Sequence, residues 1–196
     1  MIGVIQIAAM IYALSACQAA AKMERQLGAH QHGHGTLNLA IAGQTINMEL
    51  EVPGADIVGF EHKAEAAEDK AGIEESEKTL AQPLALFTLP DAARCKVASA
   101  NVDITGETKP EHDEEQDAHD GHAQQDEHRA EATHSEFHAQ YSLACSNVQA
   151  VTTILFPYFD VFPNSKELTV TLITEKGQKA FEVNREHAFI DIRGMI

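Results

Sequence analysis

Three histidines occupy alternate positions near the N-terminus, in the stretch GAHQHGHG. They are His30, His32 and His34. In an extended segment, alternate side chains point to the same side of the backbone, about 6.6 Å apart along the strand. Neutral imidazole is the commonest protein ligand for zinc, and it also suits copper and nickel. Two of these histidines can therefore hold one ion, whereas all three can do so only if the backbone bends, which Gly33 and Gly35 favour.

Further ligands have to come from elsewhere in the chain, and two single histidines are candidates. His62 ends the stretch GFEH, where it suits either a metal or a local hydrogen bond at a helix start. His138 alternates with the apolar residues Phe137 and Ala139. If those residues face the core, His138 points outward, either as a ligand or as an ordinary surface residue. His187 is isolated, and we expect it to be a surface residue.

A third source of imidazoles is the segment 106–134, which contains five histidines, ten acidic residues and two basic residues. It contains no Val, Ile, Leu, Phe, Tyr or Trp. Such a segment cannot bury enough apolar surface to offset the entropy of ordering it, so we expect a disordered loop. The loop suits either weak, shifting metal capture or a solubilising acidic linker. Its weaker candidate ligands are His112, His119, His122, His128 and His134.

The overall charge favours cations as partners. The formal net charge is −16 and no strong basic patch is present, so nucleic acid and anionic membrane surfaces are poor partners. The chain also lacks an HExxH helix pair, a GxSxG turn and a glycine-rich phosphate loop. We therefore expect a metal-binding protein and not an enzyme.

Hydrophobic periodicity predicts the elements that position these histidines. Residues 36–42 and 45–52 alternate as a half-buried hairpin, the second strand having Ile46, Met48 and Leu50 on one face. Residues 61–81 predict one helix, or two interrupted near Gly72, and a loop follows at 83–90. Further strands are expected at 95–104, 136–145, 151–156, 167–174, 178–183 and 188–192. The predicted fold class is α+β, mainly antiparallel β-sheet with a helical insertion and a disordered His/Asp/Glu-rich loop.

The first residues are typical of an export signal. Residues 1–21 are mostly apolar, carry no charge and are too short to favour a membrane span. The stretch AAA at 19–21 suits an ordinary signal peptidase, whereas LSAC at 14–17 fits a lipoprotein signal with lipid on Cys17. Both alternatives predict an exported protein with one metal-binding domain, residues 22–196, either free or lipid-anchored in the periplasm.

The cysteines favour one disulfide. If Cys17 is removed or lipidated, Cys95 and Cys145 remain as an even pair in an oxidising compartment. Eleven residues run from Cys95 to Thr105, and eleven run from Ser135 to Cys145. If these flanks pair antiparallel, the two cysteines face each other and their bond ties down a hairpin with a long loop.

Several stretches, in this order, resemble the ZrgA family of zinc-regulated periplasmic proteins: GAHQHGHGTLN, VGFEH, LFTLPDAARC, the His/acid-rich loop, EFHAQYSLAC and FPNSKELTVTLITEKGQ. The resemblance implies a zinc-binding protein of the Gram-negative periplasm, induced under zinc shortage and linked to zinc uptake. Family loops often carry dense His-Asp repeats, whereas the loop histidines here are scattered. The N-terminal histidines are therefore the stronger candidates for the principal metal site. The resemblance matches the family's recurrent histidines to His30, His32, His34, His62 and His138, and its cysteine pair to Cys95 and Cys145.

The predicted function is the capture of Zn²⁺ by these histidines in support of zinc uptake. The expected partners are divalent metal ions and a zinc-uptake transporter or its periplasmic binding protein. Two alternatives remain open at this point. One is a copper- or nickel-binding protein for storage or resistance, because copper binds more tightly than zinc at most nitrogen sites. The other is a cell-envelope interaction module whose histidines respond to pH.

Overall fold

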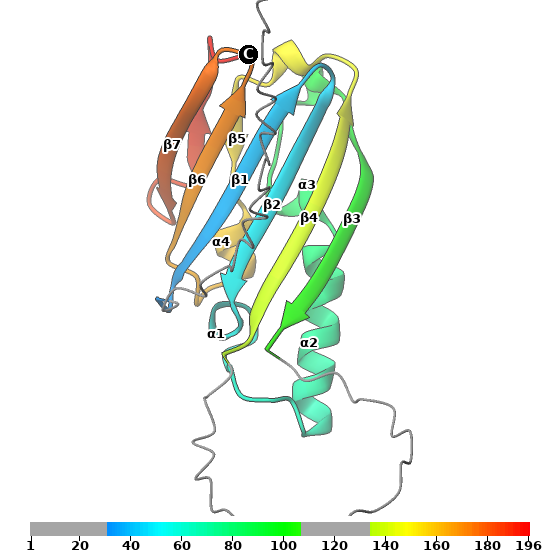
Figure 1. The fold of residues 1–196 in the computed structure, drawn as a ribbon, viewed down its shortest axis with the longest axis vertical. Coiled ribbons are helices and arrows are strands. Elements are labelled where there is room, and N and C mark those ends of the chain that lie inside the picture. The colour runs from blue at the N-terminus through cyan, green and yellow to red at the C-terminus, as the bar shows by residue number, and fades with distance from the viewer. Residues whose placement is uncertain (1–30, 107–133) are drawn as a thin grey trace, which may run out of the picture.

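The structure, a computed structural model, describes residues 31–106 and 134–196 (Figure 1). The predicted signal segment 1–21 with Cys17, and most of the predicted loop 106–134, lie outside the described residues. Of the candidate ligands, His30, His112, His119, His122 and His128 also lie outside them. Within the two described ranges, no helix has the length and apolar character needed to cross a membrane.

Six strands form one sheet in the order β3-β4-β2-β1-β6-β7. Neighbouring strands are antiparallel except for β1 and β6, which are parallel. The sheet is therefore mixed: it is mainly antiparallel, as predicted, but it contains one parallel pair that was not predicted. The strands are β1 (His34–Ala42), β2 (Thr45–Pro53), β3 (Cys95–Thr105), β4 (Glu136–Cys145), β6 (Glu167–Thr174) and β7 (Gly177–Asn184).

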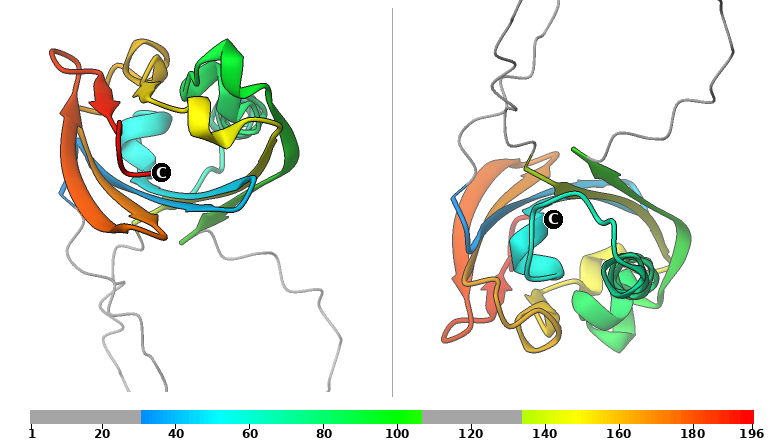
Figure 2. Two further views of the ribbon diagram at one scale, coloured as in Figure 1. Left: turned by 90° about the horizontal axis from the view of Figure 1, so that it is seen from above. Right: turned by 90° about the horizontal axis from the view of Figure 1, so that it is seen from below.

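The remaining elements all lie on one face of this sheet, which curves around them (Figure 2). The longest is α2 (Ala67–Leu80), and two short strands form a separate antiparallel pair. The short elements are α1 (Gly54–Ile57), α3 (Pro83–Leu86), α4 (Tyr158–Val161), β5 (Thr153–Leu155), β8 (Phe189–Asp191) and two 3₁₀ turns at Asp91–Ala93 and Val148–Ala150.

Alternation along the strands builds the core between the sheet and this layer. The predicted inner face of β2 is confirmed, since Ile46, Leu50 and Val52 are fully buried. Phe137 and Ala139 on β4 are buried as well, which leaves His138 on the outer face of the sheet. Burial of apolar area at roughly 25 cal/mol per Å² makes this core the main stabilising contribution. From the covering layer, Ile73, Leu80, Leu86, Phe87, Phe156, Tyr158 and Phe159 pack into the same core.

The predicted helical segment is corrected at its start, and one of its two alternatives, a single helix, is confirmed. The helix begins at Ala67 rather than at residue 61, because Ala66 has an extended backbone and the preceding residues form an irregular segment. It also runs through Gly72 without a break, since a glycine inside a helix costs only about 1 kcal/mol relative to alanine. The predicted loop at 83–90 contains the short helix α3, which starts at Pro83.

The predicted disulfide is confirmed, and the register beyond it differs by one residue. Cys95 and Cys145 are paired across β3 and β4 and joined by a disulfide. A β-bulge between Val97 and Ser99 then shifts the pairing, so that Thr105 lies opposite Glu136 instead of the Ser135 expected from equal flanks.

The directions of the strands bring four chain segments to one end of the sheet. β1 and β4 begin there, whereas β2 and β3 end there (Figure 1). The disulfide lies at the opposite end of β3 and β4. Helix α1 follows β2 directly at the end of the sheet where β2 stops. Residues that precede β1 and β4 therefore lie near residues that follow β2 and β3.

Candidate metal site

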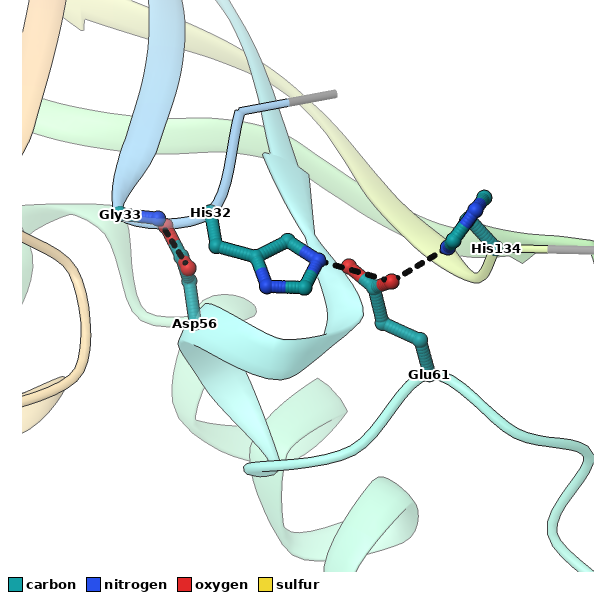
Figure 3. Close-up of polar contacts among 5 residues, drawn as sticks. All are labelled: His32, Gly33, Asp56, Glu61 and His134. Carbon is teal, nitrogen blue, oxygen red and sulfur yellow. Dashed lines mark hydrogen bonds and ion pairs between the residues drawn. The ribbon is translucent and has the colours of Figure 1, made fainter. Parts of the chain in front are cut away.

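Three side chains meet at this end of the sheet (Figure 3). His32 lies just before β1, Glu61 lies in the irregular segment between α1 and α2, and His134 lies just before β4. Nε2 of His32 is 3.1 Å from Oε2 of Glu61, and Nδ1 of His134 is 2.5 Å from the same oxygen. One ligand atom from each residue falls within 4.8 Å of the other two. Two imidazoles therefore converge on a single carboxylate oxygen.

The carboxylate is shielded while the imidazoles are open to solvent. The side chain of Glu61 is 11% exposed, compared with 62% for His32 and 55% for His134. Burial is the largest single effect on Glu61 and opposes its ionisation. The hydrogen bonds and charges of His134 and His32 act in the opposite direction and prevail, so the pKa of Glu61 lies below its usual value. Its other oxygen, Oε1, is buried without a hydrogen-bond partner among the described residues. The site therefore holds a fixed negative charge with spare acceptor capacity.

The backbone next to His32 is held from two sides. The N–H of Gly33 donates to Oδ1 of Asp56 at 2.7 Å, and its carbonyl accepts from the N–H groups of Lys166 and Glu167, each at 2.9 Å. Gly33 has a φ of +88°, and a Cβ there would approach Cδ of Lys166 to 2.8 Å. Glycine is needed at this bend. The bend directs His32 toward Glu61, whereas His34 enters β1 and pairs with Glu167.

Asp56 lies on α1 and is 2% exposed. Burial is the main influence on this carboxyl group and raises its pKa, although the bond from Gly33 and the neighbouring histidines act in the opposite direction. One of its oxygens, Oδ2, is buried without a partner among the described residues. A second carboxyl group thus lies beneath His32, within electrostatic range of Glu61.

These ligand types fit a zinc ion. Zinc is bound by imidazole nitrogen and carboxylate oxygen in a four-coordinate arrangement, and sites that exchange or process ligands keep one position open. The three donors here supply two nitrogens and one oxygen. An ion would replace the protons that the imidazoles now donate to Glu61, and the exposed His32 and His134 have room to adjust around it.

The other predicted ligands that the structure describes have different partners. His34 lies 3.3 Å from Glu167, and His138 lies 2.7 Å from Glu136 and 3.6 Å from Glu51. The ring of His62 stacks on Phe60 at 4.6 Å, and its Nδ1 donates to the carbonyl of Lys63. Within residues 31–106 and 134–196, the structure therefore joins His32 to a histidine from the edge of the predicted loop, and not to His34, His62 or His138.

Two acidic residues of this region were not predicted from the sequence. Glu61 adjoins the predicted ligand His62 in GFEH, which is the one signal that pointed to this position. Asp56 carries no signal of its own, because it belongs to a four-residue helix between a strand and an irregular segment, where no periodicity marks a buried polar residue.

Comparison with known proteins agrees with the metal-ligand character of this site. Individually curated proteins give no match. The sequence model described as "ZrgA family zinc uptake protein" matches residues 29–192, which include the whole His32–Glu61–His134 group. A match over that much of the 196 residues shows that the chain belongs to the ZrgA family of zinc uptake proteins.

Proposed function

We propose that the protein is an exported, periplasmic zinc-binding protein that captures Zn²⁺ at His32, Glu61 and His134 and supplies it to a zinc-uptake system. Membership of a zinc uptake family supports the zinc-related role. The observation that carries the proposal is the convergence of two imidazole nitrogens on one shielded carboxylate oxygen. The expected recipient is a zinc-uptake transporter or its periplasmic binding protein.

The exposure of the site suits capture followed by release. The two imidazoles are more than half exposed, so an ion can enter and leave without opening of the core. Three protein ligands leave a fourth position for water or for a ligand donated by a recipient. A closed structural zinc site, in contrast, fills all four positions with protein ligands and holds its ion permanently.

The segment 107–133 has an accessory part in this proposal. It contains four histidines and carries a net charge of −8, half of the total of −16. His112, His119, His122 and His128 are proposed to hold ions weakly and to raise the local concentration of cations near the ordered site. His30, His34, His62 and His138 remain predicted ligands. An alanine variant of each, in the titration described next, tests them one by one.

The test is native mass spectrometry of the mature protein, titrated with zinc against a competing chelator. His32→Ala, Glu61→Gln and His134→Ala should each remove the most tightly bound ion, with affinity falling more than the roughly 10- to 100-fold that loss of an outer-shell partner costs. His187→Ala is the matched control, because His187 is exposed and outside the His32–Glu61–His134 group.

Three outcomes would contradict the proposal. Retention of the tight ion in all three variants would place the site elsewhere, and its loss in His138→Ala or His62→Ala alone would reassign the ligands. Absence of zinc binding in the unaltered protein, together with a conformational change near pH 6, would favour the pH-responsive module. Competition with copper and nickel in the same titration compares the metals directly, because ligand type alone does not separate them.

A further inference from the structure

We propose that Asp56 is a positioning residue for His32, and that Oδ2 of Asp56 accepts the Nδ1–H of His32 when Nε2 of that ring binds the ion. The inference rests on the proposed function, because it assigns a partner to a ligand of that site. The juxtaposition is visible in Figure 3, where the imidazole of His32 lies between the carboxyl groups of Asp56 and Glu61. Nε2 points to Glu61, and the other ring nitrogen lies on the side of Asp56.

The chemistry of a metal-bound imidazole creates the need for such an acceptor. When Nε2 binds an ion, the remaining proton of the neutral ring is on Nδ1, and metal-binding histidines almost always donate that proton to a carboxylate, a backbone carbonyl or water. Such a partner fixes the orientation of the ring and makes the ligating nitrogen more basic. No partner for Nδ1 of His32 is found among the described hydrogen bonds, whereas its Nε2 contacts Glu61.

Asp56 has the matching unused acceptor. Its side chain is 2% exposed, Oδ1 accepts from the N–H of Gly33 at 2.7 Å, and Oδ2 is buried with no partner among the described residues. A buried acceptor without a donor is costly, so its presence in a folded protein calls for an explanation. The bond from Gly33, the residue between His32 and His34, places Asp56 next to this segment.

A purely structural role for Asp56 is the competing explanation. The bond from Gly33 to Oδ1 anchors the bend next to His32, and this bond alone would make Asp56 important for folding. The two roles use different oxygens, so they can be separated by substitution. Asp56→Asn keeps an Oδ1 acceptor for Gly33 but replaces Oδ2 by an NH₂ group, which donates and cannot accept the Nδ1 proton. Asp56→Ala removes both acceptors.

The experiment measures zinc affinity by chelator competition in the full chain for Asp56→Asn, Asp56→Ala, His32→Ala and the control Asp160→Asn. Asp160 is 85% exposed and lies 3.9 Å from Arg185, so its variant removes the same charge at a side chain outside the His32–Glu61–His134 group. We expect a 10- to 100-fold loss of affinity in both Asp56 variants, with Asp160→Asn unchanged. Wild-type affinity in Asp56→Asn together with a loss in Asp56→Ala would overturn the proposal, because Asp56 would then act only as the anchor of Gly33.

A second measurement needs no variant and stays decisive if the Asp56 variants fail to fold. Nitrogen-15 NMR of the zinc-loaded wild-type protein should show His32 as the Nδ1–H tautomer with a hydrogen-bonded, slowly exchanging ring proton. Binding of zinc through Nδ1 of His32, or a rapidly exchanging Nδ1 proton, would overturn the proposal. If His32→Ala itself leaves the affinity unchanged, the proposed function is at fault. If only His32→Ala lowers it, the site stands and the role of Asp56 fails.

Discussion

A single oxygen of Glu61 accepts from imidazole nitrogens of both His32 and His134, which makes this carboxylate the centre of the site. Burial alone would raise its pKa, but the hydrogen bonds and charges of the two histidines prevail, so the pKa is lowered in the folded protein. A carboxyl group with a lowered folded-state pKa contributes stability above its unfolded value, and this contribution is lost as the pH falls through the folded-state value. The metal-free protein should therefore be sensitive to acid at Glu61.

We predict that the Tm of the metal-free protein falls more steeply between about pH 5 and pH 3 than the Tm of Glu61→Gln, since carboxyl groups titrate there. Thermal unfolding in the presence of a chelator measures both curves. Glu65→Gln serves as the control, because Glu65 is exposed and close by in the sequence. Parallel curves of Tm against pH for the wild type and Glu61→Gln would show that the two imidazoles do not stabilise the folded protein through Glu61.

At the scale of single residues, the sequence predicts that histidines are the ligands, but it does not predict which residues share one site. His32 and His134 were both predicted as candidates, but from different segments and for different sites. What joins them is the return of β4 beside β2, a contact between residues far apart in the chain. Asp56 and Glu61 lie in segments without periodicity, and their burial depends on the fold around them. Local pattern therefore did not reveal them.

At the scale of elements, the alternating strands could be predicted because one face of each is buried, and pairing within the hairpins follows from short turns. The turn at Gly43, with a φ of +57°, joins β1 to β2 in this way. The parallel pairing of β1 with β6 could not be predicted, because nothing in either strand specifies a neighbour that is distant in sequence. The later start of α2 depends on the same tertiary context, since its boundary is not marked by a capping side chain.

The disulfide and the candidate site occupy opposite ends of β3 and β4, and this separation leads to a prediction. Replacement of both Cys95 and Cys145 by alanine should lower the free energy of unfolding by about 2–5 kcal/mol, because the unfolded chain loses a crosslink. Zinc affinity should change less than twofold, because the disulfide and the site lie at opposite ends of these strands. The strands are 11 and 10 residues long, and each residue adds about 3.3 Å. Denaturant unfolding and chelator competition on the same double variant measure the two quantities.

Unaltered stability in the double variant would contradict the first expectation. A loss of zinc affinity that matches the loss of stability would contradict the second, because it would mean that the disulfide holds the site as well as the hairpin.

At the scale of the whole molecule, the contribution of net charge to zinc binding can be separated from that of the His32–Glu61–His134 group. Deletion of residues 107–133 removes ten acidic and two basic residues but keeps His134, which belongs to the ordered group. We predict that one tightly bound zinc ion remains, that the weakly bound ions disappear, and that the association rate becomes less sensitive to salt. Electrostatic attraction of an ion is screened over about 10 Å at 0.1 M ionic strength, so a smaller net charge leaves less to screen.

Stopped-flow zinc binding at low and high ionic strength, combined with native mass spectrometry, tests this deletion. The informative comparison is with a version in which the four histidines of residues 107–133 are changed to asparagine while the charge is kept. Loss of the tight ion on deletion would make the loop, and not the ordered end of the sheet, the principal zinc site.

The parallel pairing of β1 with β6 has a consequence for the order in which the molecule matures. The hairpins β1–β2 and β6–β7 involve neighbours in the chain, but the ladder that joins His34 to Glu167 closes only after nearly the whole domain is present. Such distant contacts form slowly, because loop closure precedes any gain from pairing. The carbonyl of Gly33 accepts from Lys166 and Glu167, so the backbone beside His32 is anchored in the same late step. A chain emerging N-terminus first therefore presents His32 early, but the backbone beside His32 is fixed only after Glu167 has joined it.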